Sequence, residues 1–212
     1  MEIDWEKVRK VYDDVLDALV WECESMEREE GECARPEVRE WLEGMAKITS
    51  IVIAALDVKD WYPKWGGVLV GFRWVDQIWW LSYGPVAGGW EGPPFYSLGR
   101  PFYDFEDNEV KVPGMEKVSA ELLESPSEWE KFEEAHPEAA RHLSTVLRIL
   151  AAATNRFEVP VVLMLGGIRK KTVLSYAALL PDDFRDEDVV RAIEAMVWVY
   201  DRLREAGFPL FE

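Results

Sequence analysis

The sequence predicts an α+β domain in which helices flank one antiparallel sheet of four or five strands, built from two hairpins. Three observations lead to this fold class. First, apolar residues recur at helical spacing near both ends of the chain. Second, two pairs of apolar, β-prone segments are each joined by a short connection, as in a hairpin. Third, nothing in the order of these segments requires a parallel strand–helix–strand unit. With 212 residues, of which 49% are hydrophobic, the chain suits a single domain over residues 1–212.

Two helices are expected at the start of the chain. In the first, apolar side chains recur at helical spacing over residues 8–26, Asp4 can cap the N-terminus, and Gly31 marks a stop after an acidic run. The second begins at Pro36, a favoured first-turn residue. Its end, residues 48–56, is apolar nearly all round, which predicts a buried helix and leaves a β-strand as the alternative.

The first hairpin is expected from residues 68–75 and 78–83, joined by Asp76 and Gln77. Asp-Gln is not a favoured turn pair, so the register stays open, and a one-residue slip would exchange the two faces. In the expected register, one face carries Val70, Phe72, Trp74, Trp79, Leu81 and Tyr83, and the other carries Gly71, Arg73, Trp80 and Ser82.

The middle of the chain, residues 84–114, is rich in Gly, Pro and aromatic residues. It predicts a long ordered loop with one short strand, and long ordered loops are often functional. Helices return after this loop. One is expected to start at Ser125-Pro126, and His136-Pro137 is expected to break and restart the helix.

A second hairpin and a last helix complete the expected fold. The hairpin strands are residues 159–165 and 172–180, with a turn over residues 166–171. The last helix is expected to begin at Asp186 and to stop at Gly207.

The chain is strongly acidic, with 24 Lys and Arg against 41 Asp and Glu and a formal net charge of −17. This charge taken alone disfavours nucleic acid, although net charge governs solubility and steering rather than one groove. Gln77, Asn108 and Asn155 are the only side-chain amides, a composition typical of a thermophile's protein. No apolar run reaches the ~18 residues of a membrane span, and the acidic first residues do not form a secretory signal. We therefore expect a cytoplasmic protein with no membrane partner.

Cys23 and Cys33 flank an acidic stretch. The sequence favours two ordinary intracellular thiols over a disulfide or a metal pair. His136 and His142 are not placed to complete a zinc site, because a six-residue separation puts them on different faces of a helix. We therefore expect neither a metal site nor a cofactor.

The sequence contains no catalytic motif that we can identify. Gly66-Gly67 and Gly88-Gly89 lack the spacing of a phosphate-binding loop or a dinucleotide fingerprint, and there is no nucleophile elbow or metalloprotease helix. Carboxylate pairs at i, i+4 are unavoidable in so acidic a chain and indicate a solvated surface. We expect a protein that is not an enzyme, and an active site between Trp90 and Tyr103 stays open as an alternative.

Two features favour the binding of single-stranded nucleic acid. Six of the eleven tryptophans lie in or beside the first hairpin, whose two faces both carry Trp, and residues 169–171 are the only run of three basic residues. Both features also have ordinary structural uses, as core packing and as protection of a strand end. Together, aromatic rings that stack bases and cations that contact phosphates make a sequence-tolerant site for single-stranded DNA or RNA. The expected contact residues are Trp61, Lys64, Trp65, Arg73, Trp80, Trp90, Arg100, Arg169, Lys170 and Lys171.

Helices framing a four-stranded antiparallel sheet, with the strand segments Phe72-Arg73-Trp74 and Trp79-Trp80, resemble the ThermoDBP type of archaeal single-stranded DNA-binding protein. The resemblance covers the order of elements over most of the chain rather than a diagnostic motif. It implies that DNA binds in a cleft of aromatic and basic residues. It also implies a homodimer or a larger homo-oligomer.

The main alternative is an acidic protein-interaction module. Small acidic α+β dimers of the secretion-chaperone kind have a similar order of helices and hairpins. They hold a partner chain on exposed apolar surface, and an exposed Trp patch would serve that purpose equally well.

Overall fold

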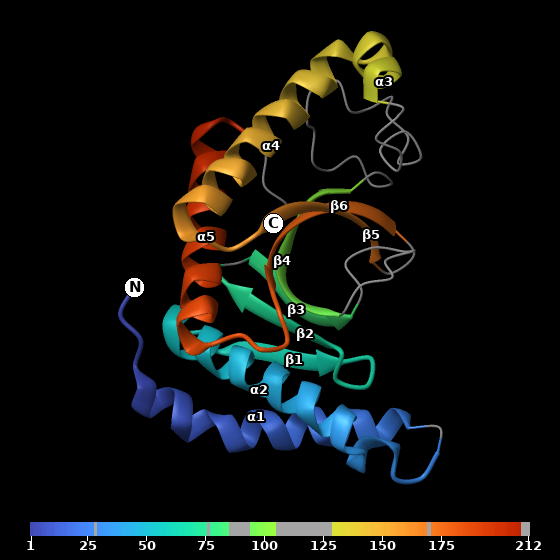
Figure 1. Cartoon of the computed structure of the whole chain (residues 1–212), viewed down its shortest axis with the longest axis vertical. Coiled ribbons are helices and arrows are strands. Elements are labelled where there is room, and N and C mark those ends of the chain that lie inside the picture. The colour runs from blue at the N-terminus through green and yellow to red at the C-terminus, as the bar shows by residue number, and fades with distance from the viewer. Residues whose placement is uncertain (28, 76, 85–93, 105–128, 169–170, 209–212) are drawn as a thin grey trace. The chain divides into compact units, whose positions relative to one another are not determined.

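The computed structural model describes residues 1–27, 29–75, 77–84, 94–104, 129–168 and 171–208 (Figure 1). These residues form five α-helices, one 3-10 helix and an open antiparallel sheet of six strands in the order β1-β2-β3-β4-β6-β5. The predicted α+β class is confirmed, and the sheet has six strands rather than four or five.

The strand that the sequence did not predict is β1 (Asp60–Lys64), which pairs with β2 (Leu69–Trp74) at one end of the sheet. β1 contains Pro63, which has no backbone N–H to donate to a neighbouring strand. Proline within a run therefore speaks against a central strand, but an edge strand tolerates it.

The contacts of the chain divide it into two compact units. Unit 1 comprises residues 1–98 and 179–194, and unit 2 comprises residues 99–178 and 195–212. Three elements contribute residues to both units: β4 (Phe95–Asp104), β6 (Lys171–Leu180) and α5 (Asp186–Glu205). A single domain over the whole chain stays a prediction.

Unit 1 begins with two long helices that lie side by side (Figure 1). In α1 (Trp5–Met26) the Asp4 carboxylate accepts a hydrogen bond from the backbone N–H of Lys7 at 3.0 Å, and this satisfies one of the free donors of the first turn. α2 (Pro36–Leu56) has proline at its first position. Both predicted starts are confirmed, and the apolar end of the second segment is helical rather than a strand.

A disulfide joins Cys23, near the end of α1, to Cys33 in the 3-10 helix η1 (Glu32–Ala34). The prediction of two free thiols was wrong. The chain turns at Gly31, whose φ of 82° favours glycine, and both cysteines are buried where α1 connects to α2. Closing so short a loop stabilises the fold by about 2–3 kcal/mol, largely by restricting the unfolded chain.

β2 and β3 (Gln77–Gly84) form the first predicted hairpin, with Trp74 opposite Gln77 and Phe72 opposite Trp79. The turn therefore consists of residues 75 and 76 rather than the predicted 76 and 77. As a result, each residue of β2 pairs with a residue two positions earlier in β3 than predicted. A shift of two retains the alternation of side chains, so the predicted faces are confirmed. Phe72 and Trp79 are each 1% exposed, whereas Arg73 on the other face is exposed.

The buried face of the hairpin lies against α1 and α2, which cover one side of β1, β2 and β3 (Figure 1). Burial of one large aromatic side chain such as Trp79 contributes roughly 4–6 kcal/mol before conformational entropy is subtracted. The side chains that form this core include Leu19, Leu42, Met45, Ile48, Val52, Val70, Phe72, Trp79 and Leu81.

A glycine on α2 admits a tyrosine from the sheet. A Cβ at Gly44 would overlap the hydroxyl group of Tyr96 on β4, whose side chain is 3% exposed. The Tyr96 hydroxyl donates to the carbonyl oxygen of Trp41 at 3.4 Å. Burial raises the pKa of the Tyr96 hydroxyl, and the nearby Tyr83 and Asp182 add to this effect. Gly44 is therefore the point at which β4 approaches α2.

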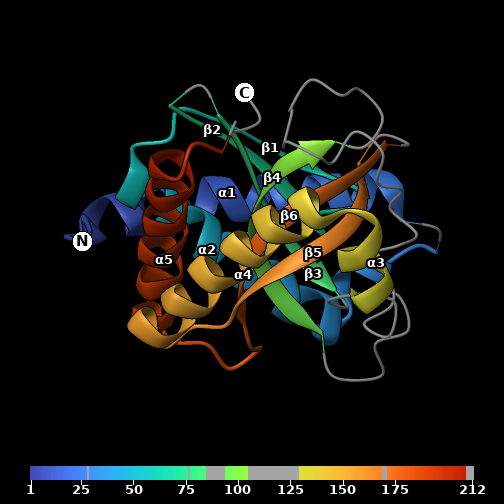
Figure 2. The same ribbon diagram turned by 90° about the horizontal axis from the view of Figure 1, so that it is seen from above.

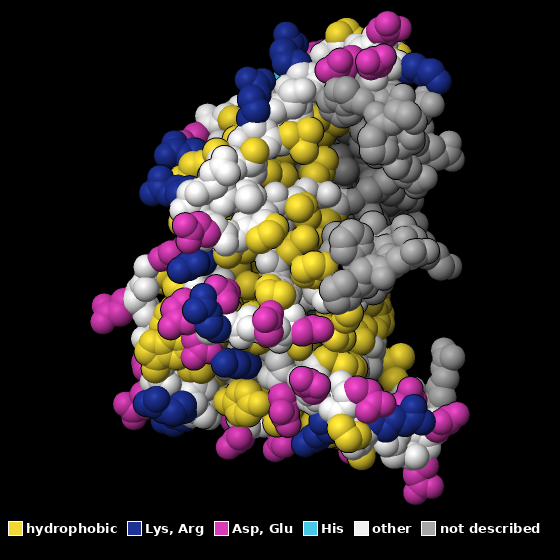
Figure 3. Space-filling model, in the orientation of Figure 1, with side chains coloured by type: hydrophobic (Ala, Val, Ile, Leu, Met, Phe, Trp, Pro, Cys, Tyr) yellow, Lys and Arg dark blue, Asp and Glu magenta, His cyan; other side chains and the backbone are white. Residues whose placement is uncertain are grey.

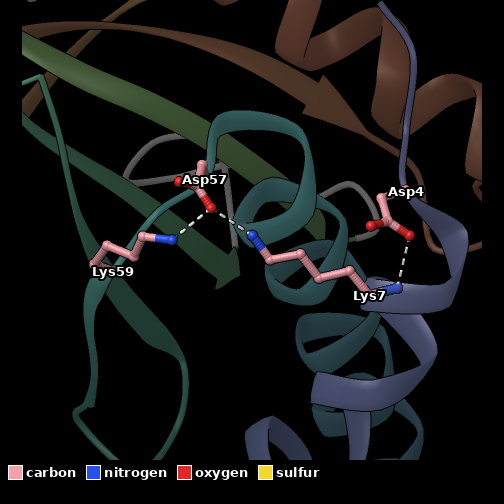
Figure 4. A network of polar contacts seen from close by, with 4 residues as sticks. All are labelled: Asp4, Lys7, Asp57 and Lys59. Carbon is pink, nitrogen blue, oxygen red and sulfur yellow. Dashed lines mark hydrogen bonds and ion pairs between the residues drawn. The ribbon is translucent and has the colours of Figure 1, made fainter.

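A polar network on the surface of unit 1 ties the start of α1 to the end of α2 (Figure 4). Asp57 ends α2 in the left-handed conformation, with a φ of 51°. Lys7 and Lys59 each donate to its Oδ1 atom, both at 2.6 Å. These hydrogen bonds, first that of Lys59 and then that of Lys7, lower the pKa of Asp57 to about 2.

Unit 2 contains α3 (Trp129–Ala135), α4 (Pro137–Phe157) and β5 (Val161–Ile168), together with most of β6. The break at His136-Pro137 is confirmed, and the start expected at Ser125-Pro126 lies outside the described residues. Both hairpin strands extend into the predicted turn, with Ile168 opposite Lys171. α4 packs against β5 in this unit, where the Thr154 hydroxyl accepts from the Val161 N–H at 2.9 Å (Figure 2).

α5 begins at Asp186 as predicted and ends at Glu205, and Gly207 follows it with a φ of 79°. Within unit 2 the buried side chains of α4, β6 and the second half of α5 include Leu143, Val146, Leu150, Tyr176, Val199 and Leu203. No helix in the described ranges combines the length and apolar character that crossing a membrane requires.

We predict that Gly44→Ala destabilises the protein by about 1–3 kcal/mol, although alanine favours a helix interior by about 1 kcal/mol. The added methyl group would displace the buried Tyr96 ring. Urea unfolding measures the change, and Tyr96→Phe is the partner for a double-mutant cycle. Because the hydroxyl is the atom nearest the added group, the cost of Gly44→Ala should fall in the Tyr96→Phe background. Equal costs in the two backgrounds would contradict this contact.

We predict that Asp57 adds to the stability of the protein above about pH 4 and that this contribution is lost as the pH falls toward about 2. The sign follows from a pKa that is lower in the folded state than in the unfolded chain. Urea unfolding between pH 2 and 5 should therefore show a shallower loss of stability for Asp57→Asn than for wild type. Asparagine tolerates the left-handed backbone, so the variant removes the charge without straining the backbone. Parallel pH profiles for the two proteins would refute the prediction.

Candidate functional site

The second face of strands β1 to β3 points away from α1 and α2 and carries aromatic and basic side chains. Its position follows from the pairing of the strands, in which Gly71 lies opposite both Tyr62 and Trp80. Tyr62 is 37% exposed, whereas the Phe72 side chain on the other face is buried. We call this surface the aromatic face, and it consists of Tyr62, Lys64, Gly71, Arg73, Ile78 and Trp80.

Gly71 lies at the centre of the aromatic face because it leaves room for a ring. A Cβ at this position would overlap the far end of the Tyr62 side chain, so the tyrosine ring covers the glycine. Trp80 flanks Gly71 on the other neighbouring strand. The backbones of Tyr62 and Trp80 are therefore two strand spacings, roughly 9–10 Å, apart. The Tyr62 and Trp80 side chains therefore lie on the same side of the sheet.

Basic groups accompany the two rings. The Lys64 ammonium lies 4.6 Å from the centre of the Tyr62 ring, within the range of a cation–π interaction worth about 0.5–1 kcal/mol at an exposed site. Arg73 is exposed on β2, and Asp60 lies opposite it on β1. On the described residues of β1 to β3, two cations and one carboxylate therefore lie near the rings.

Trp65 lies in the turn that follows β1 and is 53% exposed. Its φ is 53°, an unfavourable backbone conformation for a bulky residue, which costs of the order of 1–3 kcal/mol. The turn closes with a hydrogen bond from the Gly67 N–H to the Lys64 carbonyl at 3.1 Å. A Cβ at Gly67 would lie 2.8 Å from Leu42 and 3.2 Å from the backbone of Leu19, so the turn packs tightly on the helices. This packing fixes the backbone of the turn that carries the exposed Trp65 side chain.

The structure places the ten predicted contact residues in different environments. Lys64, Arg73 and Trp80 lie on the aromatic face, and Trp65 lies in the adjoining turn. Trp61 is opposite the buried Phe72 and lies on the core side of β1, where it is half-buried, so its role as a surface contact stays a prediction. Trp90, Arg169 and Lys170 lie outside the described residues, and of Lys171 only the backbone is described, as part of β6.

Arg100 is completely buried, so its prediction as a surface contact was wrong. It lies on β4 in unit 2, where its guanidinium is 4.8 Å from the centre of the Tyr200 ring. Burial raises the pKa of the neighbouring Tyr176 to about 12, and the charge of Arg100 offsets part of this shift. Arg100 therefore belongs to the interior of unit 2.

Tyr62 and Ile78 are the members of the aromatic face that the sequence did not predict. Ile78 is 41% exposed and precedes two tryptophans. Tyr62 could have been found only if β1 had been recognised, because the alternation of Trp61, Tyr62 and Lys64 has meaning only in a strand.

Unit 1 also has a surface cavity of about 420 Å³ that none of the predicted residues lines. Trp5, Tyr12 and Ile51 contribute to its wall, together with an ion pair in which Lys47 Nζ and Asp186 Oδ1 are 2.7 Å apart. The pair satisfies the two opposite charges mutually, and the cavity lies on the helices rather than on the aromatic face. Among the described residues, no group of three or more His, Cys, Asp or Glu side chains is arranged to hold a metal ion.

Comparison with known proteins adds no further assignment. No family model, no curated protein and no solved structure matches the chain.

We predict that the Tyr62 ring shifts the NMR resonance of a Gly71 Hα proton upfield, because that proton points into the ring where a Cβ would overlap it. Tyr62→Phe keeps the ring and should keep the shift, whereas Tyr62→Leu should abolish it. An ordinary Gly71 Hα shift in the wild-type protein would show that the ring does not cover the glycine in solution.

Proposed function

We propose that the protein binds single-stranded nucleic acid, DNA or RNA, through the aromatic face, without strong preference for sequence. Tyr62 and Trp80 would stack bases, and Lys64 and Arg73 would contact phosphates. The observation that carries this proposal is the Tyr62 ring over Gly71 with Trp80 on the next strand, close to Lys64 and Arg73 and directed away from the helices. It is a proposal for a binding protein rather than an enzyme.

The magnitudes are sufficient for useful binding. Stacking on an aromatic side chain is worth about 1–3 kcal/mol per base, so two rings supply about 2–6 kcal/mol. Each phosphate contact makes the binding constant fall as the salt concentration rises. For single strands, the logarithm of the binding constant changes by about −0.7 per unit of the logarithm of the salt concentration for each contact. Two contacts would give a slope of about −1.4. The exposed Trp65 beside the face offers a third ring.

The net charge of −17 does not prevent such binding at ordinary ionic strength. Salt near 0.1 M limits the reach of exposed charges to about 10 Å, so the groups that border the rings outweigh acidic side chains farther away. The face itself carries Lys64 and Arg73, and Asp60 lies opposite Arg73 on β1. The remaining acid of the chain lowers the rate of encounter rather than the strength of the contact.

A second candidate function is an acidic protein-interaction module or chaperone-like dimer. Trp65 and Ile78 are 53% and 41% exposed, and Val75 in the β2–β3 turn is 69% exposed. Apolar side chains in such positions are typical of surfaces that hold another chain. A homodimer or larger homo-oligomer belongs to the same proposal.

A thermophilic source and a cytoplasmic location are two further parts of the proposal. A disulfide persists in oxidising compartments, and also inside the cells of hyperthermophiles. The scarcity of side-chain amides supports a thermophilic source, and in such a source the Cys23–Cys33 disulfide is compatible with a cytoplasmic location. An archaeal source is implied by the resemblance alone. The resemblance to the ThermoDBP type stays a prediction, and it implies the same class of ligand.

We predict that a labelled oligo-dT strand binds the wild-type protein and quenches part of its Trp fluorescence. Tyr62→Leu and Trp80→Leu should each weaken binding about 5- to 150-fold, the equivalent of one lost stacking contact. Tyr62→Phe is the matched control and should bind like wild type, because it retains the ring. Fluorescence anisotropy between 50 and 300 mM salt measures affinity and salt slope, and urea unfolding verifies that each variant is folded.

Two outcomes would overturn this function. One is the absence of any binding of oligo-dT at low salt, and the other is wild-type affinity in both leucine variants. Capture of a defined peptide on the same face, with loss of capture in the leucine variants, would favour the interaction module instead.

A further inference from the structure

Helix α4 differs in charge from the other helices. Arg141, Arg148 and Arg156 lie on it together with one carboxylate, Glu138. Among the five α-helices that the structure describes, it is the one with more basic than acidic residues. A helix with an excess of basic residues is unusual in a chain that contains 41 acidic residues.

The three arginines lie on the outer side of α4. At about 100° per residue their directions fall within an arc of about 80°, and the buried Leu143, Val146 and Leu150 point the other way. All three arginines are exposed. They span 15 residues, which corresponds to about 22 Å along the helix axis. Figure 3 shows Lys and Arg side chains along the outer edge of α4. We call Arg141, Arg148 and Arg156 the arginine row.

No carboxylate of the described residues forms an ion pair with the arginine row. The Arg148 Nε donates to the Ser144 carbonyl at 3.2 Å, and Arg156 lies over aromatic rings. The arginines at the end of α5 are different, because Arg202 pairs with Glu205 at 2.6 Å. Among the described residues, Arg202 at the end of α5 is therefore paired with a carboxylate, whereas the arginine row of α4 is not.

Arg156 is held in place by aromatic contacts within unit 2. Its guanidinium lies 5.4 Å from the centre of the Phe157 ring and 5.8 Å from that of Trp198. Arg202 lies 5.2 Å from the same Trp198 ring. A guanidinium that rests on a ring loses conformational freedom while its edge keeps N–H donors for an anion. Trp198 therefore lies between Arg156, for which no carboxylate partner is found among the described residues, and Arg202, which is paired with Glu205.

We propose that the arginine row binds the phosphate backbone of single-stranded nucleic acid, as a contact additional to the aromatic face. The proposal rests on the proposed function. An array of cations about 22 Å long suits a chain of phosphates better than one small anion. Arginine also matches phosphate oxygens with paired N–H donors, which lysine does not.

The test compares two variants that each remove three positive charges. The first is Arg141→Gln/Arg148→Gln/Arg156→Gln, and the control is Arg9→Gln/Lys10→Gln/Arg35→Gln, at exposed positions of unit 1. The probe is an oligo-dT of about 20 nucleotides, longer than the usual site of 4–16 nucleotides. We expect the α4 variant to bind roughly tenfold or more weakly than wild type. The magnitude of its salt slope, the logarithm of the binding constant against that of the salt concentration, should be smaller by about 2, whereas the control should stay near wild type.

Tyr62→Leu in the same titrations separates this proposal from the proposed function. Loss of three phosphate contacts reduces the salt slope, whereas loss of a stacked base weakens binding at every salt concentration.

If Tyr62→Leu weakens binding and the α4 variant retains wild-type affinity and slope, the arginine row has no role and the aromatic face stands. If only the α4 variant is impaired, the arginine row stands and the aromatic face does not. Equal losses in the α4 variant and its charge-matched control would overturn the arginine row as a specific contact, and absence of wild-type binding would overturn both.

Discussion

The burial of Phe72 and Trp79 against α1 and α2 is the constraint on which the candidate site depends. Side chains alternate along a strand, so fixing these two rings in the core assigns every neighbour on β2 and β3 to one face or the other. Arg73 and Trp80 are on the second face for this reason, and β1 adds Tyr62 and Lys64 to it through its pairing. The site is thus a consequence of how the core is packed.

Gly44 and Gly71 each leave room for a tyrosine ring, but one ring is buried and the other stays partly exposed. Gly44 lets the Tyr96 ring enter the helix surface, where the ring is buried and joins α2 to β4. Gly71 lets Tyr62 cover a strand, where the ring stays partly exposed. In each case the absence of a Cβ makes room for an aromatic group from a neighbouring element. One contact stabilises the interior, and the other holds a ring at the surface of the proposed site.

The uneven distribution of charge reconciles an acidic chain with an anionic ligand. Net charge describes the whole molecule, whereas phosphates meet the groups within about a Debye length. Lys64 and Arg73 border the aromatic face in unit 1, and the arginine row lies on α4 in unit 2. The sequence pointed to Lys64, Arg73 and residues 169–171, the last because they are consecutive, but not to the arginine row. Cations spaced along one helix face are harder to see, since they become neighbours only when the helix forms.

The sequence by itself determined the α+β class, the long helices, the hairpin of β2 and β3 and the split of its faces, because periodicity and capping are local and a register shift of two preserves alternation. The tertiary structure alone decided the rest. It added β1, since an edge strand tolerates Pro63, and it joined Cys23 to Cys33 by a disulfide. It also buried Arg100 and turned Trp61 toward the core, because burial depends on partners distant in sequence. Residue type marks which side chains can bind a ligand, and only packing decides which of them reach the surface.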